Sequence, residues 1–320
     1  MNLSPSNANI PPLNQRGRIA SFFSLLRVKQ WAKNAFVLVP FFFSFRQHCF
    51  HGLDYGLLAY AFGVFCFLSS AVYCLNDVLD KEKDRQHPRK CQRPVASGRI
   101  SSSAAMITGC VLAITSVIVG VGLNISFTAI KTRLAALLCV GIVYLLNNIL
   151  YSIVLRRYEV IDVFSIAAGF VLRLLAGCFA LDIVPSHWLL VCGFSLALFL
   201  GFGKRRAEIA QNSEGKTNRE TFRESLRAYS PDFLNILLAV TATITLLSYM
   251  LYCISPETAA LHQTRNLIYT VPFVFFGVFR YVAAVLAGSI DGPDELLFGD
   301  KLFLVNIILW AATTSVILAV

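Results

Sequence analysis

Nine apolar runs, separated by short polar segments, account for most of this 320-residue chain. A helix needs roughly 20 mainly apolar residues to cross a bilayer, and all the runs except the first approach that length. The first is short and contains Pro40, so we expect it to borrow a turn from the basic amphipathic stretch before it. The runs cover approximately residues 34–46, 55–76, 104–124, 134–154, 161–180, 188–203, 233–253, 268–288 and 302–320. The sequence therefore predicts an all-α, polytopic membrane protein with about nine transmembrane helices.

The composition supports this class of protein. Hydrophobic residues make up 56% of the chain and charged residues 14%, against about a quarter charged in ordinary soluble domains. The nine cysteines form no C-x-x-C pair and no zinc-ligand spacing, so we expect neither a disulfide framework nor a metal–thiolate site. We expect a polar cytoplasmic tail over 1–20 and a single membrane domain over 21–320.

Lysine and arginine gather on one side of the predicted spans. With the N-terminus inside, 22 of the 28 basic residues fall in cytoplasmic segments and 4 in the opposite loops. This bias predicts the orientation of the chain, and it accounts for the net charge of +10 without a nucleic-acid partner. The predicted cytoplasmic loops are 77–103, 155–160, 204–232 and 289–301.

The most informative segment begins where the second apolar run ends. Asp77, Asp80 and Asp84 are spaced i, i+3 and i+7, which would place them on one face of a helix, with Asn76 beside them. Three neighbouring carboxylates repel one another, and a hard divalent cation that prefers oxygen ligands would balance them. We therefore predict a magnesium site here, with the three aspartates as catalytic residues.

Basic residues follow these carboxylates at once. They include His87, Lys90 and Arg93, and such groups bind phosphate oxygens. An acidic face beside a basic loop suits a metal–diphosphate ligand. The alternative is a solvated cytoplasmic loop of mixed charge.

One arginine is predicted to lie within the membrane. Arg173 shares a helix face with Asp162, Gly169 and Gly177, about three turns into the fifth run. An ionisable group at that depth is costly and indicates either a functional site or a hydrogen bond to neighbouring helices; the sequence leaves both open. The two glycines would allow close helix packing.

Five segments carry a resemblance to a known family. Asn76-Asp77-x-x-Asp80-x-x-x-Asp84 resembles the first aspartate-rich motif of the UbiA superfamily of membrane prenyltransferases. Over approximately residues 25–310 the chain most resembles the decaprenyl-phosphate phosphoribosyltransferase branch. The other segments are His87-Pro88-x-Lys90-x-x-Arg93-Pro94-x-Ala96-Ser97-Gly98, Arg27-x-x-Gln30-Trp31-x-Lys33-Asn34, Tyr151-Ser152 with Arg156, Asp162, Gly169, Arg173 and Gly177, and Gly201-Phe202-Gly203-Lys204-Arg205-Arg206-x-Glu208.

Three positions depart from the family pattern. Val28 stands where the branch usually has proline, and Arg156 stands where lysine is common. The second D-x-x-x-D motif of the wider superfamily is missing, and the sequence from Lys204 reads KRRAE instead. A basic cluster in that place would meet phosphate groups directly.

The resemblance implies a UbiA-like helix bundle with a cytoplasm-facing cavity, in a bacterial inner (cell) membrane. It implies that Mg²⁺, or Mn²⁺, is held by Asn76, Asp77, Asp80 and Asp84. The implied reaction moves phosphoribosyl from 5-phosphoribosyl 1-diphosphate to a polyprenyl phosphate, giving a lipid-linked pentose precursor for cell-wall biosynthesis. The implied substrate-binding residues are Lys33, Asn34, His87, Lys90, Arg93, Tyr151, Arg156, Asp162, Arg173, Lys204, Arg205 and Glu208.

Two other functions stay open at this point. One is an aromatic prenyltransferase, which would use an isoprenyl diphosphate and a phenolic acceptor. The other is a transporter, for which broken helices in matching halves are expected. The sequence leaves the oligomeric state and the length of the lipid chain open.

Overall fold

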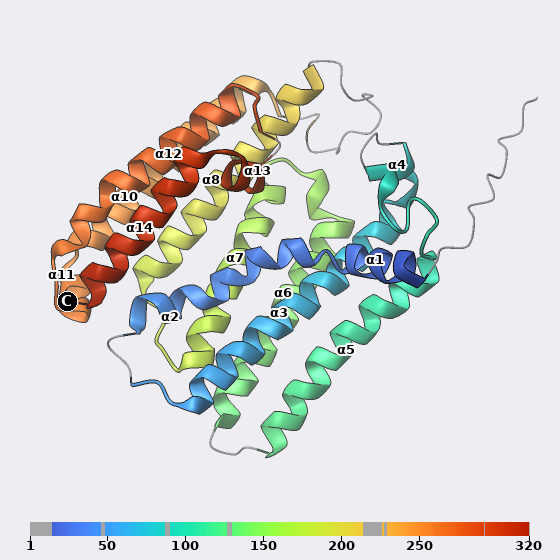
Figure 1. The fold of residues 1–320 in the computed structure, drawn as a ribbon, viewed down its shortest axis with the longest axis horizontal. Helices are drawn as coiled ribbons and strands as arrows, with labels where there is room; N and C mark the ends of the chain where they lie inside the picture. The colour runs from blue at the N-terminus through green and yellow to red at the C-terminus, as the bar shows by residue number, and fades with distance from the viewer. Residues whose placement is uncertain are drawn as a thin grey trace, which may run out of the picture.

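The computed structural model describes residues 15–45, 49–86, 90–126, 130–213, 226, 229–290 and 292–319, and regular structure in these ranges is helical throughout (Figure 1). Eight helices are long and apolar enough to cross a membrane, which confirms the prediction of an all-α membrane protein. They are α3 (Gly52–Leu79), α5 (Ser102–Ser126), α6 (Lys131–Ile153), α7 (Ile161–Leu181), α8 (His187–Ser213), α10 (Pro231–Ile254), α12 (Val271–Leu286) preceded by η6 (Asn266–Thr270), and α14 (Lys301–Ala319).

The first predicted run has a different structure. After α1 (Gln15–Leu26) the chain forms an 11-residue 3₁₀ helix, η1 (Val28–Leu38), followed by the 6-residue α2 (Val39–Ser44). A 3₁₀ helix rises about 2.0 Å per residue and an α-helix about 1.5 Å, so η1 and α2 laid end to end reach about 31 Å. This segment is therefore not one of the eight long helices, yet it has the reach of the hydrocarbon core.

Helices α3 and α7 form the centre of the bundle. Over their most apolar windows α3 is 61% and α7 56% buried, whereas α14 is only 11% buried. Both pack against η1 and α6, and α5 covers α3. Helix α8 packs on α7 and α10, with α12 and α14 beyond. Any site between α3 and α7 is thus built on the most enclosed elements.

Two glycines let α8 pack closely between its neighbours. A Cβ added at Gly201 would lie 2.5 Å from Val163 on α7, and one at Gly203 would lie 2.5 Å from the ring of Tyr281 on α12. Helix α8 then continues to Ser213, ten residues beyond the end that hydropathy predicts at 203. The basic cluster that begins at Lys204 therefore stands on a helix, although the sequence indicated a loop.

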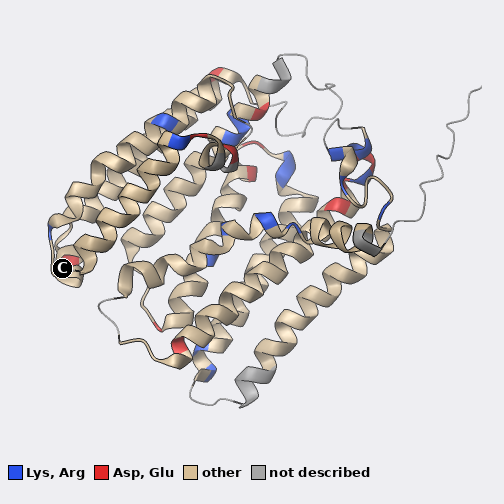
Figure 2. Ribbon diagram, in the orientation of Figure 1, with Lys and Arg blue, Asp and Glu red and all other residues tan. Residues whose placement is uncertain are grey.

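Charged residues lie mainly toward one end of the bundle, around α4 (Lys81–Arg85) and α13 (Pro293–Gly299) (Figure 2). The short elements η2 (Lys90–Gln92) and η4 (Leu155–Arg157) lie at turns between long helices, as does α11 (Pro256–His262).

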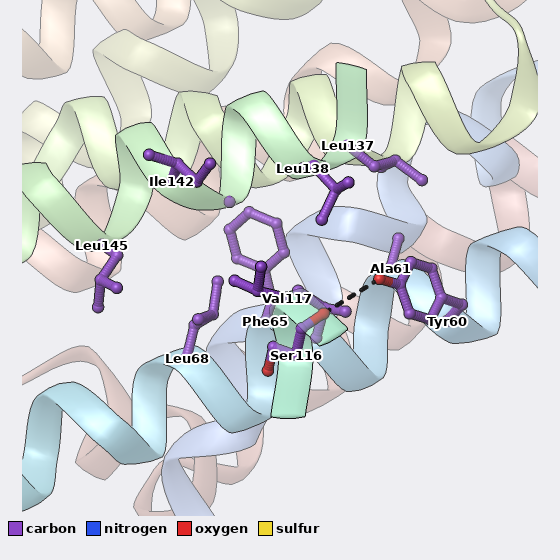
Figure 3. A pocket seen from close by; sticks show the side chains of 12 residues that line it. Tyr60, Ala61, Phe65, Leu68, Ser116, Val117, Leu137, Leu138, Ile142 and Leu145 are labelled. Atoms are coloured by element: carbon purple, nitrogen blue, oxygen red, sulfur yellow. Dashed lines mark hydrogen bonds between the residues drawn. The ribbon is translucent and has the colours of Figure 1, made fainter. Parts of the chain in front are cut away.

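A small apolar pocket of about 30 Å³ lies between α3, α5 and α6, where Tyr60 donates a hydrogen bond to the carbonyl of Ser116 at 3.3 Å (Figure 3). A volume of this size has room for about one water molecule. Its lining is mostly apolar and includes none of the predicted site residues.

Candidate functional site

The three aspartates lie where α3 gives way to α4. Asp77 is in the last turn of α3 and Asp84 is on α4, and both are buried, at 1% and 4% exposure. Asp80 stands between the helices with φ −95° and ψ 6°, and it is half-buried. The helix therefore breaks at Asp80, and the spacing of the aspartates does not map onto one continuous helix face.

Each carboxylate is paired with an arginine from a different part of the chain. Arg27, between α1 and η1, donates from Nη2 to Oδ1 of Asp77. Arg93, in the loop after α4, is 2.5 Å from Oδ2 of Asp84 and 3.6 Å from Oδ1 of Asp77. Arg156, on η4, is 2.8 Å from Oδ1 of Asp80.

The fit of a metal ion depends on the oxygen atoms that remain. Oδ2 of Asp77 and Oδ1 of Asn76 are buried and have no hydrogen-bond partner in the part of the chain that the structure describes. Carboxylate and amide oxygens are ligands of hard divalent cations, so this pair fits such an ion. Among the described residues no three His, Cys, Asp or Glu side chains come together as a metal site, and the three aspartates are paired with arginines instead.

The loop that carries Arg93 is folded by its own small residues. Pro94, Val95 and Ala96 are buried, and the amide of Ser97 donates to the carbonyl of Arg93 at 2.8 Å. Gly98 follows with φ 77°, a conformation that favours glycine. The Pro-x-Ala-Ser-Gly sequence thus sets the path of the loop. Lys90 is half-buried at its start, whereas His87 lies outside the described residues.

A second polar centre surrounds Arg173 on α7. Its Nε, Nη1 and Nη2 donate, each at 2.8 Å, to Oδ1 of Asn34, the carbonyl of Gly169 and the hydroxyl of Tyr144. The guanidinium also lies 4.7 Å from the ring centroid of Tyr144 and 5.3 Å from that of Phe170. No ion pair of Arg173 with a carboxylate is found among the described residues, so its charge is held by dipoles and rings.

Asn34 links this centre to α3 and so to the aspartates. It is fully buried on η1, and its amide donates to Oγ of Ser69 at 3.3 Å. Ser69, Tyr73 and Asp77 follow one another along one face of α3, and Tyr73 lies under the guanidinium of Arg27. The carboxylates and Arg173 are therefore the two ends of one polar seam, with about 12 Å of α3 between Ser69 and Asp77.

A third group joins α7 to α8. Arg205, 1% exposed, donates from Nε to Oδ2 of Asp162 at 2.7 Å and from Nη1 to Oε2 of Glu208 at 2.8 Å. Its Nη2 lies 3.4 Å from the hydroxyl of Tyr151. The structure thus brings four predicted site residues together, but as a buried network in which Arg205 is already paired. Lys33 and Lys204 are half-buried on η1 and α8.

Tyr229 completes this network and was missed in the sequence. Its hydroxyl donates to Oδ1 of Asp162 at 2.9 Å and accepts from the amide of Val160 at 2.5 Å. Burial and the nearby Asp162 carboxylate raise the pKa of Tyr229, so the phenol keeps the proton that it donates. The residue lies in the long polar segment 204–232, where the sequence offered no periodic signal for it.

Comparison with known proteins identifies the family. The UbiA prenyltransferase family matches residues 37–307. The decaprenyl-phosphate phosphoribosyltransferase of Corynebacterium glutamicum is 34% identical over 290 residues, 89% of this chain and 82% of that protein. The protein of the same description from Mycolicibacterium smegmatis is 28% identical over 319 residues, 95% of this chain and 93% of that protein.

A solved structure of a UbiA homolog from Archaeoglobus fulgidus, bound to GPP and Mg²⁺, has a TM-score of 0.63 at 18% identity and covers 94% of this chain and 100% of its own. At that identity the likeness concerns the fold. A UbiA match over most of the chain, joined to eight membrane-length helices and to a carboxylate and arginine cluster at the end of α3, leads to one conclusion: the chain belongs to the UbiA prenyltransferase family.

Proposed function

We propose that this protein transfers the 5-phosphoribosyl group of 5-phosphoribosyl 1-diphosphate to a polyprenyl phosphate, releasing diphosphate. The observation that carries the proposal is the interleaving of three aspartates with three arginines at one end of the polar seam. This arrangement offers metal-ligating oxygens and phosphate-binding cations in one place. The relatives that share most of this chain bear the name of the same reaction.

The aspartate cluster would receive the diphosphate. Asn76 and Asp77 have the oxygen atoms available for a first Mg²⁺ or Mn²⁺, and Asp80 and Asp84 would join once their arginines turn to phosphate. The ion, when bound, offsets the charge that develops on the leaving diphosphate. Arg93, Arg156, Lys90 and His87 would contact phosphate oxygens.

The remaining residues would orient the two substrates. The hydrogen-bonded pair of Asn34 and Arg173 would contact the ribose phosphate or the lipid phosphate along the seam. Lys33 and Tyr151 would contact the same phosphate groups. Lys204 would add positive charge from α8. Asp162, Arg205 and Glu208 would position the substrate-binding ends of α7 and α8, because their ion pairs join these two helices.

The acceptor needs little activation in this reaction. A phosphate monoester is anionic near pH 7, so it can attack the ribosyl carbon without a strong general base, and the chain's part is to position the two anions. The lipid chain would lie in apolar surroundings. A shallow groove of about 480 Å³ between α6, α7 and α8, lined by residues such as Val143, Leu172 and Phe194, is open to it.

An aromatic prenyltransferase is the second candidate. It shares the metal–diphosphate site, but the wider superfamily's second aspartate motif is replaced here by Lys204, Arg205 and Arg206 on α8. The three basic residues outnumber the two carboxylates that pair with Arg205, those of Asp162 and Glu208, and the remaining positive charge favours a second phosphate-bearing substrate over a phenolic ring. The orientation follows from the same chemistry: the cluster would face the cytoplasm of a bacterial cell, where the soluble diphosphate is made.

The test is an assay of the purified protein in lipid nanodiscs with labelled 5-phosphoribosyl 1-diphosphate and decaprenyl phosphate. We expect Mg²⁺-dependent formation of a lipid-linked product, and a loss of at least about 100-fold in kcat/KM for Asp77→Asn. Glu82→Gln removes an exposed carboxylate of the same segment and serves as the matched control. Turnover of an isoprenyl diphosphate with a phenolic acceptor, and none of the phosphoribosyl donor, would overturn the proposal.

A further inference from the structure

Arg27 lies at an unusual point of the backbone. It separates α1 from η1 with φ 50° and ψ 48°, in the left-handed region. Its guanidinium donates to Oδ1 of Asp77 and lies 4.7 Å from the ring centroid of Tyr73. One cation is therefore placed between a ring and the most enclosed carboxylate of the aspartate cluster.

The charges of the cluster balance without any further ion. Three carboxylates face three guanidinium groups, and the ion pairs are Arg27 with Asp77, Arg93 with Asp84 and Arg156 with Asp80. A divalent cation that joins this set while all three arginines stay in place meets like charge at close range. An ion at the open Oδ2 of Asp77 would share that carboxylate with Arg27 on Oδ1, so the two cations repel each other and the ion binds better when Arg27 moves away.

The surrounding contacts let the side chain move while the backbone stays fixed. Leu25 is fully buried, and the carbonyl of Leu26 accepts a hydrogen bond from Oγ of Ser70 at 2.9 Å. On the other side of the junction the indole of Trp31 donates to Oγ of Ser70 at 3.0 Å. The chain is thus tied to α3 on both sides of Arg27, at Leu26 and at Trp31, whereas the Arg27 side chain is 22% exposed.

We infer that Arg27 is a resident counter-cation of the diphosphate site: it neutralises Asp77 in the ligand-free protein and competes with the divalent ion for that carboxylate. This inference rests on the proposed function, because it takes Asp77 to be a metal ligand. The guanidinium released by the ion passes to a diphosphate oxygen, with the Tyr73 ring still beneath it. The ion alone consequently binds weakly, and ion and diphosphate bind together, each favouring the other.

The test measures binding of Mn²⁺ alone, by electron paramagnetic resonance of free Mn²⁺, to the purified full-length protein in nanodiscs. Arg27→Gln removes the competitor, so we expect Mn²⁺ to bind about tenfold more tightly than to the wild type, a gain of about 1.4 kcal/mol. Arg93, 3.6 Å from Asp77, stays near the carboxylate and limits the loss of stability. Lys29→Gln, which removes an exposed positive charge two residues away, should leave the affinity within about twofold.

Thermal unfolding gives a second reading. The metal-free Arg27→Gln protein should melt below the wild type, because Asp77 loses its closest partner, and Mn²⁺ should raise its Tm by more than it raises that of the wild type. If this variant does not fold, Arg27→Lys takes its place. We expect it to bind Mn²⁺ more tightly than the wild type, by less than tenfold.

The outcomes separate the inference from the function on which it rests. Unchanged or weaker Mn²⁺ binding by Arg27→Gln, while Asp77→Asn abolishes binding, would overturn the role of Arg27 and leave the metal site standing. Mn²⁺ binding that survives Asp77→Asn, or is absent from the wild type even with inorganic diphosphate, would overturn the proposed metal site and this inference with it.

Discussion

At Gly177 the backbones of α7 and η1 touch. A Cβ added there would lie 2.1 Å from the carbonyl oxygen of Val37 and 3.0 Å from Cγ of Pro40, distances that no side chain accommodates. The close approach brings η1 against α7 and so sets Asn34 within hydrogen-bond reach of Arg173. One residue without a side chain thus supports the inner end of the polar seam.

Gly177→Ala should therefore lower both stability and turnover. The added methyl group forces η1 away from α7, at a cost of about 1–3 kcal/mol, and moves Asn34 relative to Arg173. The measurement is the Tm in detergent together with kcat. Gly63→Ala on α3 is the matched control, since a Cβ there meets nothing within 4 Å; it should keep the wild-type Tm or raise it slightly. A wild-type Tm and turnover in Gly177→Ala would contradict this account.

The aspartates and most of their basic neighbours could be read from the sequence because they stand close together in it. Their partners could not. Arg27 is 50 residues from Asp77 and Arg156 is 76 residues from Asp80. These ion pairs therefore depend on how α1 and η1 pack against α3, and on how α6 and α7 position η4. The same holds for Arg205, whose burial beside Asp162 follows only from the contact of α7 with α8.

At the scale of elements, the start of α7 is held by a contact from a distant segment. Val160, just before the helix, has φ 63°, a conformation that is costly for a β-branched residue. Its amide donates to the hydroxyl of Tyr229, which also donates to Asp162. The segment that ends just before α10 thereby fixes the turn from which α7 begins.

Tyr229→Phe should loosen this end of α7. The substitution leaves the amide of Val160 and one oxygen of Asp162 without their partner, and we expect a loss of about 1–3 kcal/mol in the free energy of unfolding. Faster hydrogen exchange at the start of α7 is the diagnostic measurement. Tyr158→Phe is the control, because Tyr158 is 55% exposed. Equal exchange rates in both variants would show that the hydroxyl of Tyr229 does not hold the helix.

Hydropathy predicted the positions of the long helices, but it did not predict where each of them ends. It ended the sixth span at 203, where charged residues begin, although α8 continues to Ser213. On this extension Arg205 pairs with Glu208 and with Asp162 on α7, contacts that hydropathy does not register. It also could not distinguish a 3₁₀ helix from an α-helix in the first run. Pro40 and the short length of the run were the signals of a different structure there.

At the scale of the whole molecule, the candidate site lies at one end of the bundle. The aspartate–arginine pairs and the network around Arg205 lie at the ends of α3, α7 and α8 that the basic residues predict to be cytoplasmic (Figure 2). The opposite end carries α11 and only a few charges. The distribution of charge in the sequence predicts that this end is cytoplasmic, and the structure places the candidate site residues at the same end.

This orientation can be tested with two single cysteines in a background lacking the nine native ones. Gln92→Cys, in the loop after α4, and Glu257→Cys, on α11, replace exposed residues near opposite ends of the bundle. A membrane-impermeant maleimide should label Glu257→Cys in intact spheroplasts and Gln92→Cys only after permeabilisation. The reverse pattern would place the aspartate cluster outside the cell, away from any cytoplasmic supply of phosphoribosyl diphosphate. That result would contradict the proposed reaction even if the helix bundle were unchanged, because the substrate could not reach its site.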